Sequence, residues 1–339
     1  MTRKAFIGLC AALLLGNQIS QAQELKVGYL PATGHAKFFV AKEQGFFADE
    51  GLDVQLVEFT NSADGLNAII AGKLDIGAFG TAGPLVHVAR GSQLQIIGGI
   101  MGEDAALISR ADRANEIGQI SDLKGLKVAT VRMATGDAVL RGALHKNGLS
   151  WKKDIELFEL KNPPAVIEAV KSGQVDAGVV WGPHDLRAEA QGLKVVIRSG
   201  DLEPGHTCCR LVVTSQRLKQ EPQTWVSFLR AILRAEKFAS EEHEKTIDAI
   251  AKYIKLDRQL LVDSYYSPYI DQSSDPNRKG VQSFWESMQA SGFLPADGDI
   301  GESVHAELYA QALEQLAAEN PKEPFWQKLK AEFQAKDVL

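Results

Sequence analysis

Residues 26–59 read KVGYLPATGHAKFFVAKEQGFFADEGLDVQLVEF, and this stretch decides how the rest of the chain is interpreted. The alternating apolar residues of 25–30 predict a strand, and the spacing of the aromatic residues in 36–47 predicts a helix with one apolar face. A glycine ends that helix, and residues 53–59 form a second predicted strand. The loop between the first strand and the helix, Pro31 to His35, would present unpaired N–H groups to a ligand.

The strand–helix alternation continues and then recurs in the second half of the chain. GLNAIIAGKLDIGAFG begins at Gly65, and AVIEAVKSGQVDAGVVWG begins at Ala165. Each predicts a helix that turns through a glycine into a strand of the form apolar-Asp-small-Gly. Two independent uses of a common turn remain an alternative, but the matched positions favour two similar halves. The pattern predicts an α/β protein with mixed, mostly parallel sheets flanked by helices.

Helices dominate from residue 221 onward, and they carry much charge and little glycine. Neighbouring strands are predicted at 94–101 and 105–109, and at 193–198 and 210–214, with no long helix inside either pair. The chain therefore has two candidate crossings between lobes, at 98–107 and 197–211.

The length of 339 residues and the hydrophobic content of 45% suit a globular protein with two domains. At the start, Arg3 and Lys4 precede an apolar run, and Ser20-Gln21-Ala22 offers a cleavage site, so residues 1–22 are predicted to be a signal peptide. A membrane anchor is disfavoured because the apolar run is shorter than the roughly 20 residues that span a bilayer. Lipid attachment at Cys10 is disfavoured because Cys10 lies early in the run.

Charge and cysteine content exclude several classes of protein. The formal net charge is −6, and removal of Arg3 and Lys4 makes it −8. Basic runs interleaved with aromatic residues are missing from the sequence, so nucleic acid is not an expected partner. After cleavage only Cys208 and Cys209 remain, which argues against a scaffold built on several disulfides.

Ligands of open α/β sheets bind at the carboxyl ends of strands. Five loops qualify, at residues 30–35, 80–83, 133–137, 181–185 and 203–210. In two of them a threonine, Thr81 or Thr135, stands at a predicted helix start, where its hydroxyl and the free N–H groups suit a polar or anionic ligand. Ordinary helix capping is the alternative for each.

Trp181 and His184 follow a predicted buried strand, where the indole could pack on a small ligand and the imidazole could donate a hydrogen bond. A core tryptophan beside a surface histidine is the alternative. His35, His184 and His206 all fall in candidate ligand loops, but their spacing is not that of a zinc site, so no metal is expected.

Cys208 and Cys209 are adjacent, and Cα atoms about 3.8 Å apart are too close for an unstrained disulfide. Free thiols are therefore favoured over a bridge. On a strand their side chains would point to opposite faces, one buried and one toward the cleft. The sequence contains no nucleophile elbow, P-loop or dinucleotide fingerprint, so neither catalysis nor a cofactor is predicted.

The ordered set of these segments, with DLKGLKVATVRMATGDAVLRGALHKNGL between them, resembles the periplasmic solute-binding proteins of ABC importers for sulfonate, taurine and nitrate, which are related to the thiamine-precursor proteins. The resemblance covers residues 25 to 240. It implies a type II binding-protein fold with two hinged lobes, one of residues 25–103 plus 207–339 and the other of residues 104–206.

The resemblance implies a non-enzymatic periplasmic receptor, expected to be a monomer, that delivers a small polar or anionic solute to an ABC permease and its ATPase. Two alternatives are a pyrimidine-precursor protein or related iron-dependent synthase, and a metal or metalloid sensor using His206, Cys208 and Cys209. Asp137 would disfavour an anion if it faced the ligand. The candidate ligand-binding residues are Tyr29, Thr33, Gly34, His35, Gly80, Thr81, Ala82, Thr135, Gly136, Asp137, Trp181, His184, His206 and Cys208.

Overall fold

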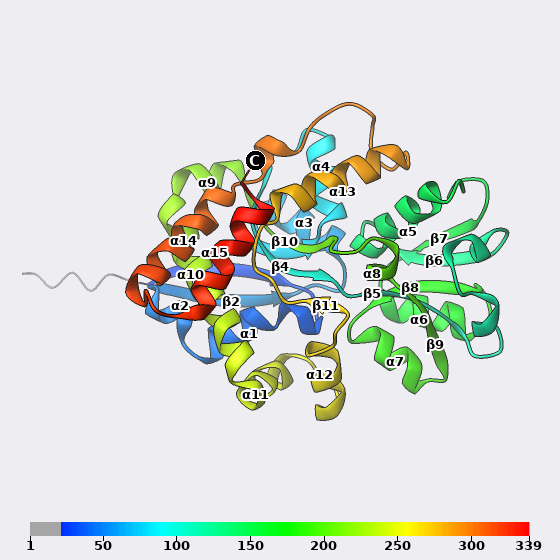
Figure 1. The fold of residues 1–339 in the computed structure, drawn as a ribbon, viewed down its shortest axis with the longest axis horizontal. Coiled ribbons are helices and arrows are strands. Elements are labelled where there is room, and N and C mark those ends of the chain that lie inside the picture. Colours follow the sequence, from blue (N-terminus) through cyan, green and yellow to red (C-terminus); the bar gives the residue numbers. More distant parts are fainter. Residues whose placement is uncertain (1–21, 339) are drawn as a thin grey trace, which may run out of the picture.

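The computed structural model describes residues 22–338, which build two β-sheets lying side by side, each flanked by helices (Figure 1). The predicted signal peptide and Cys10 lie outside the described residues, apart from Ala22. We call the part built on the six-stranded sheet lobe 1 and the part built on the five-stranded sheet lobe 2. Between residues 22 and 338 we find no helix whose length and apolar content would let it cross a membrane.

Lobe 1 contains the strand order β11-β4-β10-β3-β1-β2. Strands β1, β2 and β3 are parallel, whereas β10 runs antiparallel to both β3 and β4. The bounds are β1 Gln23–Tyr29, β2 Leu52–Glu58, β3 Ile76–Gly80, β4 Leu94–Glu103, β10 Thr207–Thr214 and β11 Ile270–Asp271.

Lobe 2 contains the order β7-β6-β8-β5-β9. Strands β6, β7 and β8 are parallel, and β5 runs antiparallel to β8 and β9. The prediction of mostly parallel sheets therefore holds only for the two βαβ halves, because strands that return from the other lobe enter each sheet in the opposite direction. The bounds are β5 Ala105–Arg110, β6 Lys127–Val131, β7 Glu156–Leu160, β8 Ala177–Trp181 and β9 Leu193–Arg198.

The helices cover both faces of the sheets, and those that follow β10 pack mainly on lobe 1 (Figure 1). The α-helices have these bounds: α1 Ala36–Glu43, α2 Phe46–Asp49, α3 Ser62–Ile70, α4 Ala82–Ala89, α5 Thr135–Lys146, α6 Pro163–Lys171, α7 His184–Ala190, α8 Ser199–Leu202, α9 Ser215–Gln220, α10 Pro222–Glu241, α11 His243–Tyr253, α12 Arg258–Tyr265, α13 Arg278–Ala290, α14 Ala306–Glu319 and α15 Pro324–Lys336. Short 3₁₀ helices occupy Thr33–His35, Ala114–Glu116, Ile120–Leu123 and Gly301–Ser303.

The two halves repeat one local design. The Asp75 carboxylate accepts a hydrogen bond from the N–H of Lys26 at 2.7 Å, and the Asp176 carboxylate accepts one from the N–H of Lys127 at 2.8 Å. Lys127 lies 101 positions after Lys26, and Asp176 lies 101 positions after Asp75, so the same pair recurs at the same spacing in both halves. Each aspartate ties the start of its third strand to the start of its first, which explains why both halves need Asp at that position.

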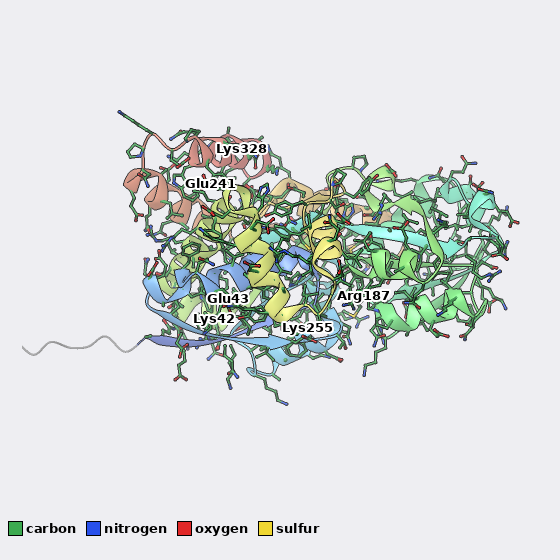
Figure 2. All side chains as sticks on the ribbon, turned by 90° about the horizontal axis from the view of Figure 1, so that it is seen from below. Lys42, Glu43, Arg187, Glu241, Lys255 and Lys328 are labelled. Atoms are coloured by element: carbon green, nitrogen blue, oxygen red, sulfur yellow. The ribbon has the colours of Figure 1, made fainter. Side chains whose placement is uncertain are left out.

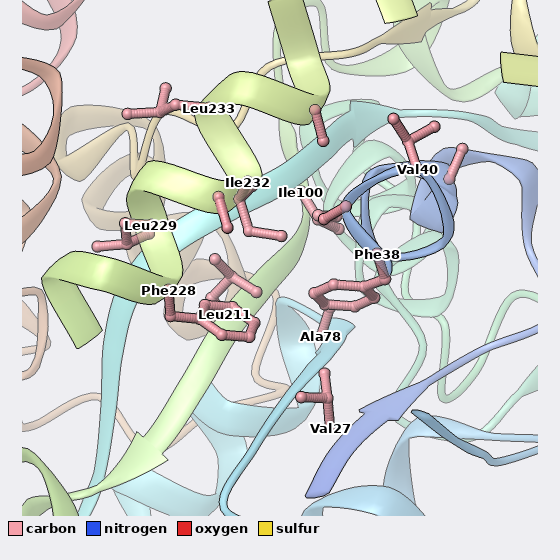
Figure 3. Close-up of a cluster of buried hydrophobic side chains, with 14 of the residues drawn as sticks. Val27, Phe38, Val40, Ala78, Ile100, Leu211, Phe228, Leu229, Ile232 and Leu233 are labelled. Carbon is pink, nitrogen blue, oxygen red and sulfur yellow. The ribbon is translucent and has the colours of Figure 1, made fainter. Parts of the chain in front are cut away.

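The core of lobe 1 lies between the sheet and the helices α1 and α10, which meet over it (Figure 3). Phe38 of α1 faces Phe228 of α10 with ring centroids 6.2 Å apart, and Val27 and Ala78 contribute from the sheet. All four residues are fully shielded from solvent. Burial of large apolar side chains of this kind contributes about 1.5–3 kcal/mol each.

The chain crosses between the lobes at residues 103–105 and again between β9 and β10, within the two predicted crossings. The crossings are tied together, because the Gly205 N–H donates to the Glu103 carboxylate at 2.7 Å and the Glu103 N–H donates to the His206 carbonyl at 3.1 Å. Glu103 and Asp104 both have positive φ, 57° and 74°. Two consecutive residues in this unfavourable region indicate a turn fixed by its surroundings.

Two helix predictions need correction. The single helix expected over residues 36–47 ends at Glu43, because Gly45 has φ of 76° and starts the separate helix α2. The helix α15 lies in the stretch where helices are expected, but the sequence did not place it individually. It buries Trp326 and Leu329 against lobe 1, although its sequence pattern carries a weak apolar face.

Candidate functional site

A cavity lies where the two lobes meet, at the carboxyl ends of their parallel strands. Its volume is about 20 Å³, so the two lobes leave little free space between them. Segments of both lobes line it, since β1, β3 and β10 reach it from lobe 1 and β5, β8 and α5 from lobe 2. The lining residues are Leu30, Ala32, Ser62, Gly80, Met101, Ala105, Ala134, Thr135, Gly136, Trp181, Cys208 and Cys209.

One backbone carbonyl connects the lobes at this cavity. Cys208 O accepts hydrogen bonds from the Thr81 N–H at 2.5 Å, from the Thr81 hydroxyl and from the Thr135 hydroxyl at 2.9 Å. The Thr81 N–H also approaches the Thr135 hydroxyl oxygen at 2.9 Å. Thr81 stands before α4 in lobe 1 and Thr135 starts α5 in lobe 2, so these bonds join the two lobes directly.

Small residues allow this close approach. A Cβ on Gly80 would come within 3.0 Å of the Thr135 hydroxyl oxygen, and a Cβ on Gly136 would come within 2.6 Å of the Val179 side chain. A larger residue at position 80 would hold the N-terminus of α5 away from lobe 1, whereas one at position 136 would push α5 away from the sheet of lobe 2. The predicted residues Gly80, Thr81, Thr135 and Gly136 therefore lie together.

Trp181 lines the cavity from the end of β8, with its ring edge toward His184 at a centroid distance of 6.0 Å. His184 lies behind the tryptophan, outside the cavity lining, and its Nδ1 has no partner. Burial, with a smaller effect of Arg187, lowers the pKa of His184 to about 3. The imidazole is therefore neutral at pH 7 and can act only through a hydrogen bond.

The loop after β1 reaches the cavity through Leu30 and Ala32 rather than through the residues predicted from it. His35 is fully buried, and its Nδ1 accepts a hydrogen bond from the Leu30 N–H at 3.3 Å. Burial, with Lys37 nearby, lowers the pKa of His35 to about 3. The neutral ring therefore shapes the loop.

The other predicted residues near this loop also lie outside the cavity lining. The hydroxyls of Thr33 and Ser264 lie 2.6 Å apart, and Gly34 packs against Met101. The Tyr29 hydroxyl donates to Glu58 at 3.3 Å, and burial with the neighbouring Glu58 raises its pKa to about 12. Ala82 is buried in the first turn of α4.

Asp137 does not reach the cavity lining either. Its carboxylate is fully buried and pairs with Arg141 at 2.9 Å, and it accepts a bond from the Thr130 hydroxyl at 3.1 Å. The Arg141 guanidinium lies 3.9 Å from the Trp151 ring centroid and 4.4 Å from that of Phe293. The guanidinium of Arg141 thus compensates the negative charge of Asp137 inside lobe 2. Asp137 does not face the cavity, so the repulsion of an anion expected for an inward-facing Asp137 does not arise.

Cys208 and Cys209 are free, as favoured from the sequence, but the expectation that they point to opposite faces is wrong. Both are buried, both line the cavity, and their sulfurs lie 3.8 Å apart. The pairing of β10 with β4 shifts register between Thr207 and Cys209, and such a bulge places neighbouring side chains on one side. The hydrogen bond between the thiols lowers the pKa of Cys208 and raises that of Cys209.

His206 does not complete a metal site with these cysteines. Its ring stacks on Phe284 at 6.2 Å, and its Nδ1 lies 3.3 Å from the Thr207 carbonyl. Within residues 22–338, no three His, Cys, Asp or Glu side chains are grouped as metal ligands.

Sequence reasoning missed several contributors to the site. Ser62 accepts a hydrogen bond from the Gly80 N–H at 3.1 Å, and Met101 and Ala105 come from the strands on either side of the first crossing. None of these residues belongs to a recognisable motif, although the crossing predicted at 98–107 includes Met101 and Ala105. Asp104, at the centre of the crossing, is buried with an unpartnered Oδ2.

Comparison with known proteins gives relatives over most of the chain. An aliphatic-sulfonates-binding protein of Bacillus subtilis is 27% identical over 262 residues, which are 74% of this chain and 76% of that protein. The periplasmic nitrate-binding protein NrtA of Synechocystis aligns with a TM-score of 0.77 at 18% identity, over 90% of this chain and 92% of NrtA.

A zinc-bound ligand-binding component of an ABC-type import system from Staphylococcus aureus aligns with a TM-score of 0.74 at 18% identity, over 86% of this chain and 99% of that one. These structural alignments show the periplasmic binding-protein fold that the sequence predicts. Residues 19–255 match the NMT1-like family, which is more than half of the chain. The chain belongs to the NMT1-like family.

Proposed function

We propose that the chain is the solute-binding component of an ABC importer, holding a small polar solute between its two lobes and delivering it to a permease with its ATPase. The observation that carries this proposal is the cavity between the lobes. Beside it, the hydroxyls of Thr81 in lobe 1 and Thr135 in lobe 2 both donate to the Cys208 carbonyl. A solute between the lobes would contact both, and its binding energy would favour their closed arrangement.

Further parts of the proposal follow from the relatives. Sulfonate, taurine or nitrate is the class of solute suggested by the names of the Bacillus and Synechocystis proteins and by the sequence resemblance. Export through residues 1–22 would place the protein in the periplasm, where it acts as a monomer. We place the division between lobes at residues 25–103 plus 207–339 and 104–206, along the two sheets.

The architecture also favours binding over catalysis. The cavity lining is mostly apolar or small, with Ser62, Thr135 and two thiols as its polar side chains. A micromolar dissociation constant requires about −8 kcal/mol, which a few hydrogen bonds and one aromatic contact can supply. Trp181 would provide that contact.

A thermal-shift screen of residues 23–339 tests the proposal with sulfonates, taurine, nitrate, pyrimidine precursors and soft metals. At least one organic solute or oxyanion is expected to raise the melting temperature, and Thr135→Val is expected to reduce this shift. Thr246→Val is the matched control, because Thr246 is fully buried in α11, away from the cavity. Stabilisation by soft metals alone, lost on thiol alkylation, would replace the proposal with a metal-sensing role.

A further inference from the structure

Asp104 stands at the first crossing between the lobes, and two segments hold its backbone. Its N–H donates to the Tyr269 carbonyl at 3.1 Å, and its carbonyl accepts from the Gly182 N–H at 3.3 Å. Tyr269 follows α12 in lobe 1, whereas Gly182 follows β8 in lobe 2. The position of the Asp104 side chain is therefore set by both lobes.

The carboxyl group of Asp104 adjoins the cavity. A Cβ on Gly182 would lie 2.7 Å from Asp104 Oδ1 and 3.2 Å from Oδ2, so the carboxyl packs on the backbone beside Trp181. Its neighbours in sequence and space, Ala105 and Trp181, line the cavity. The Ser264 hydroxyl reaches the same glycine, at 3.0 Å from that Cβ position, and it pairs with Thr33. A carboxyl and two hydroxyls thus meet where the lobes face each other.

This carboxyl lacks the partner that a buried charge needs. Asp104 is only 5% exposed, and its Oδ2 accepts no hydrogen bond. The nearby cation, Arg198, donates instead to Asp185 at 2.6 Å. Burial, together with Asp185 and Cys208, holds the pKa of Asp104 well above its usual range. An unpaired buried carboxylate is costly, and a cation brought by a ligand would remove that cost.

The described side chains that line the cavity carry no cation that would attract a simple anion. The lining residues, all within the described part of the chain, include no lysine, arginine or histidine. The Thr81 and Thr135 donors are already used by the Cys208 carbonyl. Among the described residues, the charged groups near the cavity with an unused bonding position include Arg210 and Asp104. Arg210 already donates to the Met101 and Asp275 carbonyls through its two Nη atoms, whereas Asp104 has no charged partner.

We infer that Asp104 is a specificity-determining residue, and that the solute carries a protonated nitrogen, an ammonium or amidinium group, which pairs with Asp104 Oδ2 between the Thr33–Ser264 hydroxyls and Trp181. This inference rests on the proposed solute-binding function and narrows the solute class. A simple oxyanion brings no cation to Asp104 and could only accept a hydrogen bond from its protonated form.

Calorimetric binding to residues 23–339 tests the inference with matched solutes that differ only at the nitrogen. The pairs are taurine with isethionate, glycine with glycolate, and 4-aminopyrimidine with 4-hydroxypyrimidine, and nitrate is added alone. In at least one pair, the dissociation constant of the amino compound is expected to be at least ten times lower than that of its hydroxyl counterpart. This comparison uses the wild-type protein, so it holds even if a variant fails to fold.

The variant Asp104→Asn is expected to reduce that preference to less than threefold. Asp275→Asn is the matched control, since Asp275 is also a buried aspartate with an unpartnered Oδ2. Its carboxyl lies beside Asp337 rather than beside Gly182 and Trp181, so this variant should keep the wild-type preference.

The outcomes separate the two proposals. If solutes bind but none prefers the amino form, or if Asp104→Asn retains the preference, the inference about Asp104 is wrong while the binding function stands. If no solute of any pair, nor nitrate, nor any member of the wider screen binds, the proposed function itself fails.

Discussion

The buried carboxylate of Asp137 is held by a specific partner, the guanidinium of Arg141. Both side chains are at most 1% exposed, whereas the second acidic partner of Arg141, Glu159, is 40% exposed. Removing one member of a buried ion pair leaves the other uncompensated and typically costs about 3–5 kcal/mol. A partner near the surface contributes much less.

We therefore expect Asp137→Asn to lower the free energy of unfolding by about 3 kcal/mol, within that range for a broken buried pair. Glu159→Gln is the control and should cost less than about 1 kcal/mol. Urea unfolding followed by tryptophan fluorescence measures both. If Asp137→Asn and Glu159→Gln lowered the free energy of unfolding equally, the burial of the Asp137–Arg141 pair would not explain its contribution to stability.

Asp275 predicts a dependence of stability on pH. Burial and the neighbouring Asp337 raise the pKa of Asp275 to about 8, far above the value of an unfolded aspartate. The folded protein therefore holds a proton that the unfolded chain releases, and this contribution to stability is complete below pH of about 4 and is lost as the pH rises toward 8.

The difference in unfolding free energy between the wild type and Asp275→Asn should thus decrease steadily from pH 4 to pH 8. Urea titrations at several pH values measure it. A difference that is constant over this range, or that grows with pH, contradicts the assignment of the proton to Asp275.

At the residue scale, sequence reasoning reached Gly80, Thr135, Gly136, Trp181 and Cys208, because glycine, hydroxyl and aromatic residues at strand ends carry a recognisable pattern. It could not find Asp104, because an isolated aspartate between two strands looks like any turn residue. Nor could it foresee that Cys208 and Cys209 share one side of the strand, since a bulge depends on the partner strand β4.

Besides the stacking of Arg198 on Tyr269 at 4.4 Å, the lobes touch beside α13 and beside α11. On one side the Trp151 indole N–H donates to the Ser291 carbonyl after α13 at 2.8 Å, and Phe293 packs on Arg141. On the other, the Arg187 side chain of α7 donates to the Lys255 carbonyl after α11 at 3.1 Å, and both residues are labelled in Figure 2. Both contacts support the closed arrangement.

Removing the first contact should weaken solute binding without unfolding either lobe. Phe293→Ala is expected to lower the affinity about fivefold, since a contact worth about 1 kcal/mol in the closed state alone shifts the equilibrium toward the open state. Phe333→Ala, whose ring stacks on Tyr309 within lobe 1, is the control. If the two variants bind solute equally well, the contact does not bias closure.

The order of elements was predictable, and their directions were not. The two βαβ halves have a strict pattern of helix, glycine and strand, which explains why β1–β3 and β6–β8 were placed well. The antiparallel β5 and β10 depend on how the chain returns between lobes, which no local pattern encodes. Helix α15 was missed because its burial depends on the lobe 1 surface that it covers.

At the scale of the whole molecule, the fold is a pair of lobes joined by two short crossings that are bonded to each other through Glu103. Few residues would have to change conformation for the lobes to separate, because the contacts across the cavity are a small set of hydrogen bonds. The resemblance seen in the sequence predicted this architecture, since its motifs mark both halves in order.

The central claim is that a solute closes the lobes on itself, and small-angle X-ray scattering of residues 23–339 tests it most directly. We expect the radius of gyration to fall when the protein is saturated with the solute identified by the thermal screen, and the saturated scattering curve to match the closed arrangement described above. Identical curves with and without bound solute would contradict the account.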